Sequence, residues 1–157
     1  MREWHEFLHR LKLRVGPWEP KMLATDFSPF RFSTSGLPER ERLPIWREQF
    51  CRALLRVDIE PKEGLPFHAA VELRALPELR VVRGTWSAVR FCRNRALAAD
   101  GDDSIGLIVG EGCTASQRGR GVADAAGDGV AVLTQEPVDV TFAESSVFSV
   151  VVPLLRL

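Results

Sequence analysis

The second half of the chain carries a series of short apolar runs, which read Trp86-Ser-Ala-Val-Arg-Phe91, Ser104-Ile-Gly-Leu-Ile-Val-Gly110, Val130-Ala-Val-Leu-Thr134, Val138-Asp-Val-Thr-Phe142 and Val147-Phe-Ser-Val-Val-Val152. Most of these runs are rich in valine or isoleucine, and Gly, Asp, Ser or Pro residues separate them. Short strands at near-regular spacing, with turn residues between them, are typical of an antiparallel sandwich or barrel. The series therefore predicts a mainly β fold.

Upstream segments extend this pattern. His68–Leu76 alternates in the manner of a half-buried strand, and Leu79–Arg83 with Thr85–Phe91 indicates a hairpin that turns at Gly84. Residues Arg93–Asp103 indicate a polar loop with a strong turn signal near its end. We therefore expect a cupin-like or jelly-roll antiparallel barrel with accessory α-helices.

Two segments have the apolar spacing of helices. Arg2–Val15 carries one apolar stripe and ends at a Gly-Pro pair, so it predicts an N-terminal helix. A second helix is predicted after Thr34, whose hydroxyl is a candidate cap, and it carries Trp46 as a core anchor. Pro44 is expected to kink or delay its first turn. We divide the chain into an N-terminal helix with an irregular extension, residues 1–31, and a barrel domain, residues 32–157.

Composition excludes several functional classes. The formal net charge of the 157 residues is +0, which predicts no direct attraction to nucleic acid or to anionic lipid. No apolar run approaches the roughly 20 residues that span a bilayer, and no secretory signal is evident. The 3 cysteines have no metal-binding spacing, which is typical of reduced thiols. We therefore expect a cytoplasmic protein without a membrane partner.

Catalytic and metal-binding patterns are missing from the sequence. The only histidines are His5, His9 and His68, and no acidic or cysteine partner joins the first two in a known ligand pattern. The glycine pairs Gly110-Glu-Gly112 and Gly119-Arg-Gly121 indicate hairpin corners rather than phosphate-binding loops, since neither opens a helix. We expect no metal, no cofactor and no enzymatic activity.

A small barrel can hold one small ligand, so the polar residues of the predicted strands are candidate contacts. If Trp86 and Arg90 share an inward face, Arg90 would bind a ligand carboxylate and Trp86 would wall the pocket; otherwise Arg90 is solvated outside. Gln117 and Arg120 bind a ligand or tie loops together. His68 contacts a ligand or a local strand partner.

The ordered set of segments from Phe32 onward resembles the sensor domains of AraC-type bacterial transcription regulators. The resemblance depends on Phe32-Ser-Thr-Ser-Gly-Leu-Pro-Glu-Arg-Glu-Arg-Leu-Pro-Ile-Trp46-Arg-Glu, Trp86-Ser-x-x-Arg90, Asp102-Asp103, Gln117-x-Gly-Arg120, Gly127-Asp128 and Val151-Val-Pro153. It implies a cupin-like domain that binds a small effector and forms dimers, with DNA bound only through a helix-turn-helix module that lies outside this sequence.

Three functions are open, and the resemblance favours the first of them. The first is the sensor domain of an AraC-type regulator, which binds a small anionic or amphipathic effector and self-associates as a homodimer. The second is a ligand-free protein interaction module. The third is a metal-free cupin-type enzyme. For the first function, the candidate ligand contacts are Trp86, Arg90, Gln117, Arg120 and His68.

Overall fold

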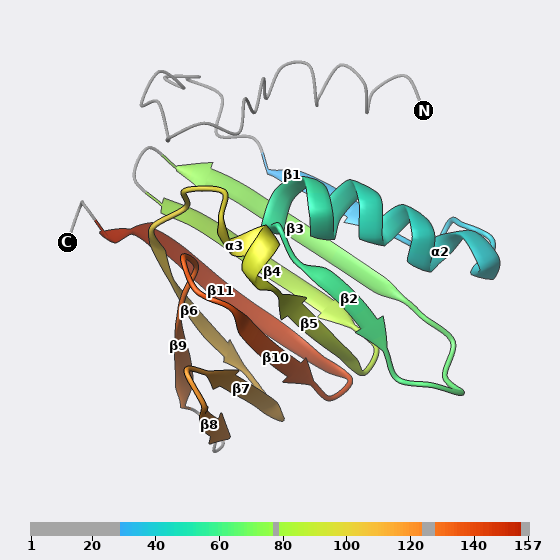
Figure 1. Cartoon of the computed structure of the whole chain (residues 1–157). Helices are drawn as coiled ribbons and strands as arrows, with labels where there is room; N and C mark the ends of the chain where they lie inside the picture. The colour runs from blue at the N-terminus through green and yellow to red at the C-terminus, as the bar shows by residue number, and fades with distance from the viewer. Residues whose placement is uncertain (1–28, 77–78, 124–127, 155–157) are drawn as a thin grey trace.

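The computed structural model describes residues 29–76, 79–123 and 128–154, which form two antiparallel sheets facing one another (Figure 1). The six-stranded sheet has the order β1 (Phe30–Ser33), β3 (Ala69–Leu76), β4 (Leu79–Trp86), β11 (Ser145–Pro153), β6 (Ser104–Gly110) and β9 (Gly129–Leu133). The five-stranded sheet has the order β2 (Asp58–Pro61), β5 (Val89–Arg93), β10 (Val138–Phe142), β7 (Cys113–Gln117) and β8 (Arg120–Ala123). The predicted mainly β, cupin-like arrangement is confirmed.

Alternation along the strands builds the core between the sheets. In β10, Val138, Val140 and Phe142 are buried, while Asp139 and Thr141 point to the other face. The other strands that face the interior repeat this pattern, and their buried side chains join one continuous apolar cluster. Each fully buried valine or phenylalanine contributes about 1.5–3 kcal/mol, so this periodicity is the main source of the fold's stability.

A helical segment covers the side of the sandwich where β1 and β2 form the two sheet edges (Figure 1). It consists of α2 (Glu39–Trp46) and η1 (Arg47–Leu55). Trp46 is 0% exposed and stacks on Phe32 of β1 at 5.6 Å between ring centroids. On the other edge, Arg47 donates a hydrogen bond to the carbonyl oxygen of Ile59 in β2 at 2.9 Å. The helix and the role of Trp46 as a core anchor are confirmed.

The two ends of this helix differ from the sequence-based expectation. Thr34 does not cap it, because the Thr34 hydroxyl instead accepts from the N–H of Ala69 at 2.9 Å and joins β3. The first helical turn follows Pro38, which supplies no side-chain cap. The second half, η1, has π geometry, and its wider turn places Phe50 and Cys51 together on the buried side below Trp46.

The hairpin predicted to turn at Gly84 is wrong. Gly84 lies inside β4, paired with Val71 and Val147 on either side. A Cβ built on Gly84 would stand 2.3 Å from Cζ3 of Trp86, so the absent side chain is what makes room for the indole ring. Glycine inside a strand often marks such a close approach, and here it does so rather than marking a turn.

The glycine pairs have different roles. The predicted hairpin at Gly119 is confirmed: β7 and β8 pair across a two-residue turn in which Arg118 and Gly119 have φ of 55° and 71°. The hairpin predicted at Gly110 is wrong, because β6 and β7 belong to different sheets and the chain crosses between them there.

Three other expectations concern where segments begin and end. The predicted polar loop contains a short helix, α3 (Arg95–Ala98), which Asn94 caps through its side chain. β1 begins at Phe30, two residues before the predicted start of the barrel domain. The predicted N-terminal helix lies outside the described residues, so that expectation stays a prediction.

Candidate functional site

Trp86 lies in the core at the end of β4 and is 3% exposed. Its ring meets Phe91 and Phe142 edge-on, with each pair of ring centroids 5.4 Å apart, and these two phenylalanines are 5.5 Å from one another. The Trp86 indole N–H is buried without a hydrogen-bond acceptor in the part of the chain that the structure describes. The aromatic trio therefore occupies the interior at the point where the sequence predicted a pocket wall.

Arg90 lies on the outer face of the five-stranded sheet, so of its two predicted positions the solvated one outside agrees with the structure, and it does not share an inward face with Trp86. It donates hydrogen bonds to Glu60 at 2.7 Å and to Asp139 at 2.8 Å. The hydrogen bond to Glu60, with the charges of both carboxylates, raises the pKa of the Arg90 guanidinium. The chain changes sheets between β4 and β5, so the face alternation of Trp86 does not carry over to Arg90.

Gln117 ties the two sheets together on the side opposite the helix. Its amide nitrogen donates to the carbonyl oxygen of Leu133 at 2.8 Å, and its amide oxygen accepts from the Leu133 N–H at 3.0 Å. The side chain thus pairs with β9 as a neighbouring strand would. Of the two readings of Gln117, the loop-tying one agrees with this geometry. Arg120, at the start of β8, is exposed.

His68 precedes β3 at the other end of the sandwich, where β10 ends. Its Nε2 lies 3.5 Å from a carboxylate oxygen of Glu144, and its side chain is 48% exposed. The strand register places Gln117 beside Val138 at one end of β10, and Phe142 at the other end. The predicted contacts His68, Trp86, Arg90 and Gln117 are therefore spread over the molecule rather than gathered in one site.

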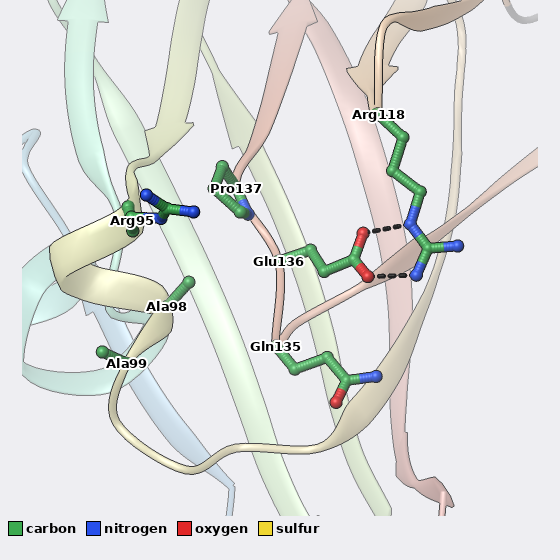
Figure 2. A pocket seen from close by; sticks show the side chains of 7 residues that line it. All are labelled: Arg95, Ala98, Ala99, Arg118, Gln135, Glu136 and Pro137. Carbon is green, nitrogen blue, oxygen red and sulfur yellow. Dashed lines mark hydrogen bonds and ion pairs between the residues drawn. The ribbon is translucent and has the colours of Figure 1, made fainter.

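An open cleft of about 520 Å³ lies at the end of the sandwich where Gln117 lies. Figure 2 shows the side chains that line it. Three segments line it, which are α3 with the residue after it, the β7–β8 turn, and the loop before β10; the lining residues are Arg95, Ala98, Ala99, Arg118, Gln135, Glu136 and Pro137. Sequence reasoning missed this cleft. Its one signal is that Arg118 lies within the Gln117-x-Gly-Arg120 segment.

One ion pair crosses the cleft. The Arg118 guanidinium donates two hydrogen bonds to the Glu136 carboxylate, through Nε and Nη2. This bidentate contact lowers the pKa of Glu136 and raises that of Arg118. In Figure 2, Arg95 stands on the other side of Glu136 from Arg118. Arg95 is exposed and has no hydrogen bond or ion pair with another described residue.

The buried Arg93 fixes the base of the cleft. It is 3% exposed and donates to the carbonyl oxygens of Thr134 at 2.7 Å and Arg56 at 2.8 Å. Its Nη2 donates to the Asp100 carboxylate at 2.8 Å. Since Thr134 precedes the loop that lines the cleft and Arg56 directly follows η1, one side chain joins the cleft to the helix.

No group of three or more histidine, cysteine, aspartate or glutamate side chains in residues 29–76, 79–123 and 128–154 is placed to hold a metal ion. Over the same ranges, every helix is too short or too polar to cross a bilayer.

Comparison with known proteins finds one matching family model and several structures of similar fold. A family model described as the AraC-binding-like domain matches residues 46–157. The structure of the AraC-like transcriptional activator CuxR superimposes with a TM-score of 0.70 at 17% identity, over 83% of this chain and 49% of that one. A predicted oxalate decarboxylase from Thermotoga maritima gives a TM-score of 0.42 at 9% identity, over 83% of this chain and 96% of the other. No curated protein matches. The chain spans about half the length of the activator.

Proposed function

Because the chain belongs to the AraC-binding-like domain family, we propose that it is the effector-sensing domain of an AraC-type bacterial transcription regulator. The observation that carries the proposal is the family match from Trp46 to the last residue, together with a fold shared with an AraC-like activator. A regulator's full activity, including DNA binding by a helix-turn-helix module and action in the cytoplasm, is part of this proposal.

The proposed activity is binding without turnover. A sensor needs a site that a small molecule can enter and fixed contacts that pass its presence to the rest of the protein. The open cleft provides access, and the hydrogen bonds of Arg93 and Gln117 connect its walls to η1 and to both sheets. Both features support a sensor, and neither requires a catalytic group.

A second function, self-association or docking of a partner protein, is supported by an apolar surface. Leu107 and Val109 of β6 are each 45% exposed, and Phe148 of β11 is 43% exposed. Val109 and Phe148 are register partners, so these side chains lie together on the outer face of the six-stranded sheet. Exposed apolar patches of this kind mark interaction surfaces. Sedimentation velocity of the wild type and of Leu107→Lys tests it: the variant is expected to shift a dimer toward monomer.

The sensor proposal is tested with a chimera. Residues 1–157 are joined to the DNA-binding module of an AraC-type activator, and a reporter gene is measured against a panel of anionic, neutral and cationic small molecules. We expect at least one compound to change reporter output only when residues 1–157 are present. If the chimera and the isolated DNA-binding module respond identically to every compound, the sensor proposal is wrong.

A further inference from the structure

The interior offers little freedom around the residue first predicted to wall a pocket. Trp86 is held between Phe91 and Phe142 on one side and the Gly84 backbone on the other. A ligand that reached the Trp86 indole would have to displace at least one of these rings from a close-packed core, which is destabilising. The cleft at the end of the sandwich needs no such displacement.

The cleft has an excess of positive charge in a chain whose formal net charge is +0. Two guanidinium groups, Arg95 and Arg118, and one carboxylate, Glu136, line it, which leaves a net formal charge of +1. Glu136 binds Nε and Nη2 of Arg118, so Nη1 of Arg118 and all the donors of Arg95 make no hydrogen bond with another described residue. Guanidinium donors prefer carboxylate or phosphate oxygens as partners.

Glu136 stands between the two arginines, and the surface on the Arg95 side of it is apolar. Ala98, Ala99 and Pro137 present carbon surface, while the polar amide of Gln135 lies beside Glu136 (Figure 2). Ligand sites of this type combine apolar surface with a few polar groups that fix orientation, and their volumes are about 300–1,000 Å³. The cleft, at about 520 Å³, is within that range.

The walls are also held in place before any ligand binds. Gln117 fixes the strand before Arg118 to Leu133, and Arg93 fixes Thr134 and Asp100 on the loops that flank the cleft. Such preorganisation lowers the entropic cost of binding. It means that the backbone positions of the cleft walls are set mainly by the fold rather than by the ligand.

We propose that this cleft is the effector site, and that it takes a small organic carboxylate whose acid group binds Arg95 and Arg118 while its hydrocarbon part lies on Ala98, Ala99 and Pro137. The inference rests on the proposed sensor function and deepens it by assigning a site and a ligand class.

The test is isothermal titration of the purified 157-residue chain with benzoate and hexanoate, and with their neutral isosteres benzamide and hexanamide. Arg95→Gln and Arg118→Gln are compared with Arg120→Gln, which removes an exposed arginine of neighbouring β8 that does not line the cleft. We expect at least one carboxylate to bind the wild type more tightly than its amide does. Loss of one charged donor is expected to weaken its Kd by about tenfold or more, and Arg120→Gln to leave it within about twofold.

The outcomes distinguish failure of the cleft assignment from failure of the sensor function. Binding of the amides as tightly as the acids, or equal Kd values for Arg95→Gln and Arg120→Gln, would overturn the cleft assignment and leave the sensor function standing. Inorganic phosphate is included as a further anion: if it binds through both arginines and no carboxylate does, the ligand class is wrong. If the chimera responds to no compound and neither acid binds, both claims are wrong.

Discussion

Replacing Gly84 with alanine tests the packing that fills the interior. The added Cβ would lie 2.3 Å from Cζ3 and 2.9 Å from Cε3 of Trp86, and 3.1 Å from the carbonyl oxygen of Ala70. The indole cannot simply rotate away, because Phe91 and Phe142 pack against it at 5.4 Å between ring centroids. The clash therefore has to be absorbed by the core itself.

The magnitude follows from two opposing terms. Overpacking costs about 1–3 kcal/mol, and the confinement of the Trp86 ring places Gly84→Ala near the upper value. Removing a glycine from the unfolded ensemble returns roughly 0.5–1 kcal/mol. The free energy of unfolding is thus expected to fall by about 2 kcal/mol, which corresponds to a Tm about 4–8 °C lower for a chain of this size.

Urea unfolding followed by tryptophan fluorescence measures this change, and Gly121→Ala is the matched control. Gly121 is also a strand glycine, but it is exposed and has no heavy atom within 4 Å of the added Cβ. Its substitution is expected to stay within about 0.5 kcal/mol of the wild type. If the two variants are equally stable, or if Gly84→Ala costs as much in a Trp86→Leu background, the reasoning about the indole contact is refuted.

Three further predictions concern buried polar and thiol groups. Arg93→Met is expected to lower the free energy of unfolding by about 3–5 kcal/mol in urea denaturation, because it removes the cation that pairs with the Asp100 carboxylate and the donor to the Thr134 and Arg56 carbonyls. A loss no larger than that of Arg95→Met would contradict this. Burial alone would raise the pKa of Asp102, but hydrogen bonds from Ser104 and the Arg80 guanidinium hold that pKa below its ordinary value. The Asp102 carboxylate therefore stabilises the fold fully above its unfolded-state pKa of about 3.9, and this contribution is lost as the pH falls through the lower folded pKa. In measurements of the free energy of unfolding against pH, Asp102→Asn should fall less steeply in acid than the wild type. An equally steep fall in both proteins would refute this. Burial also raises the pKa of the Cys51 thiol, which makes this thiol slow to react. Mass spectrometry after iodoacetamide treatment at pH 8 should therefore find the partly exposed Cys92 alkylated before Cys51. Equal alkylation rates would show that Cys51 is accessible.

The strands of the second half could be predicted from the sequence because their signal is local. Valines at every second position in Val138–Phe142 give the period of a strand with one buried face, whatever it pairs with. Trp46 could be placed in the core for the same reason, since the apolar spacing of its helix does not depend on distant residues. These predictions needed only the identities of near neighbours.

The roles of Gly84 and Gly110 depend on distant residues, and both were therefore predicted wrongly. Whether Gly84 turns the chain or lies under an aromatic ring is decided by where Trp86, Phe91 and Phe142 meet, and these rings come from three strands. The crossing after Gly110 likewise depends on which sheet pairs with each strand. No local pattern distinguishes a hairpin glycine from a crossover glycine.

The candidate site was even less accessible to sequence reasoning. Arg95, Arg118 and Glu136 are separated by about twenty residues each along the chain, and only the antiparallel register of β7 and β10 brings the last two together. For Arg90 the sequence is compatible with a ligand contact, but the fold places Glu60 and Asp139 beside it, and these carboxylates are its partners.

Thermal unfolding of the purified chain, with and without each compound of a chemically mixed small-molecule panel, tests the sensor function most directly. A ligand that binds only the folded state adds about 2.7 kcal/mol at a concentration of 100 times its Kd. We predict that at least one compound raises Tm saturably by about 5–10 °C at that concentration. A panel in which every compound leaves Tm unchanged, while Leu107→Lys splits a dimer of the same protein, would contradict the sensor account and favour an interaction module.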